Sequence, residues 1–341
     1  MTPKTDPGRF FEDYRLGETL VHATPRTLGE GERALYHALY PSRVALASSD
    51  GFARSCGLPR APLDDLLLFH TVFGRTVPDV SLNAVANLGY AEGRVRRLAF
   101  PGADVRATSE VIGLRQVGSG KAGIVWVRTR GTVDGEAALD YVRWVLVAKR
   151  DPDAPAPDPV VPDLAPAVAA ADLAIPEGLH FRDFDHAAAG APHRARDYAP
   201  GERIDHVAGV TVEEAEHMMA TRLWQNTARV HFDATHRADG RRLIYGGHVI
   251  GLARALSFDG LQTAQVVAAI NAGTHANPCF AGDTVRAWSE VLDVATLRED
   301  VGALRLRTVA TTGAPFERLG DDGKHRAEVL LDLDYWVLLP A

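Results

Sequence analysis

Long hydrophobic runs are absent from this chain of 341 residues. No stretch approaches the roughly 18 apolar residues that a membrane helix requires, and the opening MTPKTDPGRF lacks the apolar core of a signal peptide. We therefore expect a cytoplasmic protein with no membrane partner. The hydrophobic fraction of 46% still supplies ample core for two domains, or for one large pseudo-symmetric domain.

Cysteine and excess positive charge are also lacking. Cys56 and Cys279, the only cysteines, fit neither a disulfide framework nor a metal-binding spacing, so we expect two buried small hydrophobic residues and no metal. The net charge of −7 argues against nucleic-acid binding, which depends on neutralising phosphates with Lys and Arg. A local cluster, Arg94, Arg96 and Arg97, is either a solvated face or a contact for a phosphorylated ligand.

What the chain does have is an internal repeat. FPGADVRATSEVI at 100–112 returns as FAGDTVRAWSEVL at 280–292, with eight of thirteen positions identical. A second pair, DYRLGE at 13–18 and DYAPGE at 197–202, occurs in the same order. Two matched landmarks in one order indicate a duplicated unit, so each feature of one half can be compared with its counterpart.

The join between the copies is visible in the composition. Residues 151–179 contain seven prolines and few large apolar side chains, which is typical of a semi-extended linker. We predict an N-terminal unit over 1–150, a linker over 151–179 and a C-terminal unit over 180–341.

Each unit has the pattern of an α+β fold. Small and apolar residues alternate with polar ones at 105–111 and at 285–291, which predicts half-buried strands. Further strands are predicted at 123–129, 141–147, 303–309 and 335–339. No helix separates them, so the sheet is expected to be antiparallel. Upstream, Pro62 to about Phe73 and Gly247 to about Phe258 suit buried helices, and shorter helices are predicted to open at Thr27 and Thr211, the latter with a capping box.

The two buried helices open differently. In the second copy, Gly246 and Gly247 leave the first backbone N–H groups of the helix uncovered, and such amides bind anions and developing oxyanions. In the first copy, Asp64 and Asp65 would satisfy those amides themselves, so no carbonyl oxygen is expected there. A simple tight turn is the alternative explanation of the glycines.

A second difference lies just before these helices. Asn226 and His231 stand where the first copy has Ser42 and Ala47. A lone histidine is often structural, but an imidazole suits proton transfer near neutral pH, and a carboxamide can orient a water molecule without titrating. The pair therefore suits addition or removal of water beside an activated carbonyl.

These residues resemble the MaoC-like hydratases of the hotdog fold, whose pattern G-D-x-N-P-L-H precedes a helix that opens A-H-G. The corresponding stretches are QNTARVH at 225–231 and YGG at 245–247, in which the histidine matches and Asn226 replaces the catalytic Asp of the family. FAGDTV at 280–285 resembles the family's P-G-D-T-L strand start. Both copies fit, so the resemblance covers nearly the whole chain and implies a double hotdog, in which each antiparallel sheet wraps a long central helix.

Within that family, FFEDYRLGETLVHATPRTL and QNTARVHFD are similar to the 2-methylfumaryl-CoA (mesaconyl-CoA) hydratases, also called β-methylmalyl-CoA dehydratases. The resemblance implies a hydro-lyase that adds water reversibly to the C=C bond of 2-methylfumaryl-CoA to give β-methylmalyl-CoA. It also implies a CoA-thioester substrate, no cofactor, because the CoA is part of the substrate, and a homodimer.

On this interpretation the C-terminal unit holds the active site. The Gly247 backbone N–H, with Gly246 beside it, would bind the thioester carbonyl; His231 would act as general base and acid; and Asn226 would hold the water. Arg229, which replaces the family's Pro, is a candidate partner for the free carboxylate of the substrate.

Two further residues are candidates at the same site. Asp233 and His248 are near in sequence and could supply a second titrating or substrate-contacting group, whereas a surface or capping acid and a helix-face imidazole are the structural alternatives.

Three other activities fit parts of the pattern. Another MaoC-like hydratase would use the same residues on a different enoyl-CoA. A hotdog thioesterase would use the same helix start but needs a carboxylate to activate water. A non-catalytic acyl-CoA-binding protein would agree with the missing Asp.

Overall fold

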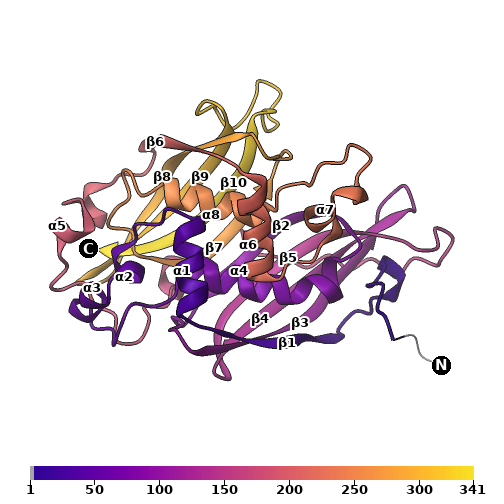
Figure 1. Cartoon of the computed structure of the whole chain (residues 1–341), viewed down its shortest axis with the longest axis horizontal. Helices are drawn as coiled ribbons and strands as arrows, with labels where there is room; N and C mark the ends of the chain where they lie inside the picture. Colours follow the sequence, from indigo (N-terminus) through magenta and orange to yellow (C-terminus); the bar gives the residue numbers. More distant parts are fainter. Residues whose placement is uncertain (1–3) are drawn as a thin grey trace.

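The computed structural model describes residues 4–341, which form one ten-stranded antiparallel sheet with helices on one face (Figure 1). Its strand order is β1-β3-β4-β5-β2-β7-β10-β9-β8-β6. Each strand of the first half has its counterpart at the mirrored place, so the order describes a pseudo-twofold axis between β2 and β7. These two strands pair antiparallel, with Tyr90 opposite Gly273 and Arg94 opposite Ala269, and they join the two halves into one sheet.

The repeat seen in the sequence extends to every main element. The strands are β1 (Thr19–Leu28), β2 (Ala84–Val95), β3 (Ala103–Gln116), β4 (Ala122–Val133), β5 (Glu136–Ala148), β6 (Arg203–Thr211), β7 (Val266–His275), β8 (Thr284–Arg298), β9 (Val301–Thr312) and β10 (Val329–Pro340). The helices are α1 (Glu30–Leu39), α2 (Ala45–Ser48), α3 (Asp50–Ser55), α4 (Asp65–Thr76), α5 (His186–Ala189), α6 (Glu214–Trp224), α7 (Arg229–Phe232) and α8 (Gly246–Leu256). The short helices α2 and α7 occupy corresponding positions in the two halves.

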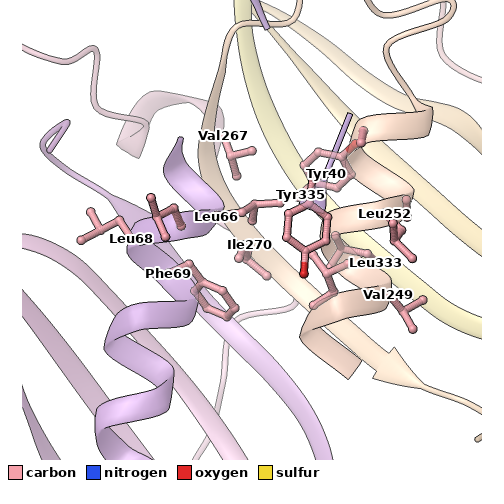
Figure 2. Packing of buried hydrophobic residues seen from close by; sticks show 14 of the residues in the cluster. Tyr40, Leu66, Leu68, Phe69, Val249, Leu252, Val267, Ile270, Leu333 and Tyr335 are labelled. Carbon is pink, nitrogen blue, oxygen red and sulfur yellow. The ribbon is translucent and has the colours of Figure 1, made fainter. Parts of the chain in front are cut away.

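The core lies between the sheet and the two central helices, α4 and α8. Nearly every side chain of both helices is buried, as expected for helices with a continuous apolar sequence. Figure 2 shows Phe69 of α4 and Val249 of α8 on either side of Ile270 of β7, with Tyr335 of β10 between Ile270 and Val249. One hydrophobic cluster therefore spans both halves and holds them together.

The structure confirms the α+β fold and the antiparallel sheet, and it corrects some helix starts. Thr211 does not cap a helix: it ends β6, where its hydroxyl bonds the Thr284 hydroxyl at 2.9 Å, and α6 begins after Glu213. Thr27 likewise lies in β1. Both residues are in strands because β6 remains paired with β8 as far as Thr211, and β1 remains paired with β3 beyond Thr27.

The segment between the copies is folded onto the molecule. Between β5 and β6, Val168, Leu179 and Phe181 are buried in a second cluster with Leu46 and Ala47 of α2. The domain boundaries at residues 150 and 180 remain a prediction, as does the homodimer. No helix among residues 4–341 is long and apolar enough to span a membrane.

Candidate active site

A cavity of about 280 Å³ lies against the second-half helix α8 and is lined by both halves of the chain. The second half contributes Asn226, His231 and Gly246, which the sequence singled out. The first half contributes residues from β2 and β5, including Tyr90 and Arg143. Most of the remaining wall is apolar, as in sites that receive small organic ligands.

His231 is held in one tautomer. Its Nδ1 lies 2.7 Å from the Leu243 carbonyl oxygen, which can only accept, so Nδ1 carries the proton and donates it. The Nε2 lone pair therefore remains available. Burial lowers the pKa of His231 to about 4, so the imidazole is neutral at neutral pH. The geometry therefore leaves Nε2 as the unprotonated ring nitrogen, which a general base requires.

Asn226 is almost fully buried beside this base. Its Oδ1 accepts the Ala228 N–H at 3.1 Å, which turns the chain into α7, and this bond leaves the Nδ2 hydrogens as the groups that Asn226 can offer to a ligand. The amide can therefore donate to a ligand in this site. It can bind a water oxygen that in turn donates a proton to His231.

The start of α8 presents unoccupied backbone donors. Tyr245 occupies the N-cap position without a side-chain cap, and its own N–H donates to His217 Nε2 at 2.9 Å. The amides of Gly246 and Gly247 have no acceptor within the described part of the chain. A Cβ on Gly246 would lie 2.3 Å from His275 Cε1, and one on Gly247 equally close to the Tyr245 ring, so both positions require glycine.

The first half has no such opening. Asp64 Oδ1 accepts the Leu66 N–H at 2.9 Å and so caps α4, as the sequence predicts. The Asp65 carboxylate accepts the Val267 N–H, and its burial raises its pKa to about 8. Only a void of about 10 Å³ remains there, because Leu46 and Ala47 of α2 fill the space.

Among the other predicted site residues, His248 lies behind the cavity. It is 1% exposed, its Nδ1 lies 2.6 Å from the Tyr40 hydroxyl, and its ring contacts that of His217. His217 in turn contacts His231, with ring centroids 6.2 Å apart. His248 therefore belongs to a buried layer of imidazoles that supports the site and does not line the cavity.

Arg229 and Asp233 also lie outside the cavity lining. Arg229 is exposed and donates to Asn83 Oδ1 at 3.1 Å and to the Pro7 carbonyl at 3.2 Å. Asp233 accepts the N–H and the hydroxyl of Thr235, and these bonds lower its pKa. The cluster of Arg94, Arg96 and Arg97 is also not part of this lining.

Several cavity residues were missed by sequence reasoning. His275 and Tyr90 lie across the β2–β7 junction, with Nε2 3.1 Å from the phenol oxygen. Arg143 had a usable signal: it is in phase with Tyr141 and Val145, which face the interior from β5. The period-two pattern of this strand therefore predicts that the Arg143 side chain faces the interior together with apolar ones.

Both cysteines are buried and free, as expected, and burial raises the pKa of Cys56 to about 11 and of Cys279 to about 12. Within residues 4–341, no group of three or more His, Cys, Asp or Glu side chains could hold a metal ion.

Comparison with known proteins finds relatives that match nearly the whole chain. The family model described as mesaconyl-CoA hydratase matches residues 2–316. A mesaconyl-CoA hydratase from Cereibacter sphaeroides is 69% identical over 99% of both chains, and a beta-methylmalyl-CoA dehydratase from Chloroflexus aurantiacus is 56% identical over 100% of this chain and 99% of its own.

Solved structures agree at the level of the fold. A MaoC domain protein dehydratase from Chloroflexus aurantiacus has a TM-score of 0.96 at 55% identity and covers 99% of both chains. Rv0216 from Mycobacterium tuberculosis, described as a double hotdog, has a TM-score of 0.77 at 24% identity over 98% of this chain and 99% of its own. The fold is thus the double hotdog, and the chain belongs to the mesaconyl-CoA hydratase family.

Proposed function

We propose that this protein is a mesaconyl-CoA hydratase that adds water reversibly to 2-methylfumaryl-CoA and forms β-methylmalyl-CoA. The observation that carries the proposal is the fixed tautomer of His231, which leaves Nε2 unprotonated in a residue that lines the cavity together with Asn226 and with Gly246 at the uncapped start of α8. Membership of the family supports the choice of substrate.

The start of α8 would bind the thioester oxygen. The Gly246 and Gly247 amides would donate to it, and because negative charge grows on that oxygen when water adds to the conjugated C=C bond, these donors favour the transition state over the substrate. Losing one such donor typically costs about 3 to 4 kcal/mol of barrier.

His231 and Asn226 would handle the water. The Asn226 Nδ2 would donate to the water oxygen while His231 Nε2 takes one water proton, so that the oxygen bonds to the β-carbon. Hydration then needs one proton at the α-carbon, and His231 can return the proton it took. The reverse sequence removes the α-proton and delivers a proton to the departing hydroxyl.

The structure gives no support to the alternative activity, that of a thioesterase. That reaction needs a carboxylate to activate water, and no Asp or Glu lines the cavity in the described chain.

The two reactions give opposite signals in one assay. With mesaconyl-CoA, hydration removes the ultraviolet absorbance of the conjugated enoyl thioester and releases no thiol, whereas thioester hydrolysis releases CoA that a disulfide reagent detects. We expect loss of absorbance without thiol. Release of thiol at the same rate, or binding without turnover, would contradict the proposal.

A further inference from the structure

The cavity contains a buried positive charge with no negative charge to match it. Arg143 is 0% exposed and lines the cavity, whereas no Asp or Glu in the described chain does so. Nor does any carboxylate in residues 4–341 form an ion pair with its guanidinium, whereas the buried Asp334 is paired with Arg305. Arg75 and Arg254 are also buried without a carboxylate partner, but neither lines this cavity. A buried charge is costly unless it is paired, so this arrangement is suited to an anionic ligand.

The guanidinium is oriented by neutral groups alone. Its Nη2 donates to the Thr76 hydroxyl at 2.6 Å and to the Ser81 hydroxyl at 3.3 Å, and its Cζ lies 4.2 Å from the centre of the Phe73 ring. The Nε and Nη1 groups are buried and have no acceptor. Arg143 is therefore held in place while part of its hydrogen-bonding capacity remains unused.

We propose that Arg143 binds the free carboxylate at the end of the acyl group and so selects dicarboxylic over monocarboxylic thioesters. This assignment rests on the function proposed above for the substrate's identity. In 2-methylfumaryl-CoA the carbon that receives the hydroxyl also carries that carboxylate, so its binding group must share a cavity with the base. Phe73 contacts both Arg143 and Tyr245, and the Tyr245 ring lies 5.5 Å from that of His231.

The pseudo-symmetry supports a specific role. On the sheet Arg143 of β5 pairs with Val127, and the corresponding position of β10, opposite Leu306, is Tyr335. The arginine thus lies in the half whose β5 lines the open cavity, whereas Tyr335, its counterpart, lines a separate void of only about 10 Å³. The carboxylate partner expected earlier, Arg229, is exposed and outside the lining.

Binding of unreactive thioesters tests the proposal without catalysis. Methylsuccinyl-CoA keeps the carboxylate, whereas 2-methylbutyryl-CoA replaces it with a methyl group, and neither has a C=C bond to hydrate. By calorimetry the native protein should prefer methylsuccinyl-CoA by about 10- to 100-fold, the usual range for a hydrogen bond to a charged group. Arg143→Gln should abolish this preference, and Arg143→Lys, which keeps the charge, should retain part of it.

Arg229→Gln is the matched control and should keep the full preference. If Arg143→Gln does not fold, Thr76→Val, which removes the 2.6 Å bond but keeps the side-chain shape, should lower the same ratio by a smaller factor. The assignment would be overturned if Arg143→Gln kept the native preference for methylsuccinyl-CoA, or if Thr76→Val kept it where that variant replaces Arg143→Gln. It would also be overturned if Arg229→Gln lost the preference instead.

The two proposals can fail separately. A native protein that prefers methylsuccinyl-CoA but does not hydrate mesaconyl-CoA would contradict the proposed function and leave Arg143 as a carboxylate site. A native protein that hydrates mesaconyl-CoA, with an Arg143→Gln variant whose kcat/KM falls equally for mesaconyl-CoA and 2-methylcrotonyl-CoA, would contradict only the role of Arg143.

Discussion

The surroundings of His231 keep its imidazole neutral, as the proposed role of general base requires. Because burial lowers its pKa to about 4, the base form persists well below neutral pH. We expect kcat/KM for hydration to stay level from about pH 8 to about pH 5 and to fall as the pH drops through about 4, where Nε2 becomes protonated. Initial rates measured across this range check the prediction.

Replacement of the same residue gives a matched pair of variants. His231→Gln should lower kcat by about a hundred- to ten-thousandfold, the usual worth of a general base. His236→Gln, at an exposed imidazole nearby, should not change kcat. Near-native turnover in a folded His231→Gln protein would remove His231 from the mechanism.

Asn226 is the departure from the family pattern, and restoring the acid is informative. In Asn226→Asp, a carboxylate beside the base should favour the imidazolium and move the acid limb of the pH–rate profile upward by about 1 unit or more. It should also raise the KM for mesaconyl-CoA, because two negative charges would share the cavity. A large gain in kcat with an unmoved profile would instead show that the amide is a compromise.

Site residues could be predicted where the two copies of the repeat could be compared. Asn226 and His231 were distinguishable because Ser42 and Ala47 occupy the corresponding sequence positions in the first copy. Asn226 and His231 both line the cavity. Arg143 was missed because its significance lies in what surrounds it, a cavity without acids, and the sequence order of β5 does not show which cavity it faces.

At the scale of elements, the start of α8 depends on its two glycines. Gly246→Ala should lower kcat/KM at least tenfold, because its Cβ would meet the His275 ring and displace the helix start from the thioester oxygen. Gly31→Ala is the matched control: it lies within α1 with nothing near its Cβ and should raise stability by about 0.5 to 1 kcal/mol with unchanged activity. Equal kinetics in both variants would argue against a role for the α8 amides.

Some strands could be predicted from their local sequence pattern, and others could not. The strands with clear alternation, β3 and β8, were predictable, whereas β2 and β7 were not. Those two strands are rich in Ala, Gly and Asn, and their pairing on both sides comes from distant parts of the chain. Pairing over long sequence distances also explains why Thr211 extends a strand and does not cap a helix.

At the scale of the whole molecule, buried imidazoles should make the fold sensitive to acid. Burial lowers the pKa of His70 and His217 to about 3 and that of His248 to about 4. The unfolded chain binds protons near pH 6.5 and the folded chain does not, so this contribution to stability is full above about 6.5 and decreases as the pH falls toward 4.

These three side chains set an upper limit of about 4 kcal/mol lost per pH unit in that window. Thermal unfolding at pH 7 and at pH 5 should show a clear drop in Tm, and His248→Gln should make the drop shallower. A Tm that stays flat between these pH values would show that the imidazoles protonate without unfolding.

The palindromic strand order has a consequence for how selectivity can arise. In a dimer of two identical single units, every substitution appears at both sites, so a base, an arginine and a filled pocket cannot be distributed independently. Joining the units in one chain removes that restriction. In the proposed mechanism the second half keeps the residues for proton transfer, and the first half contributes β5, with its buried Arg143, to the same cavity.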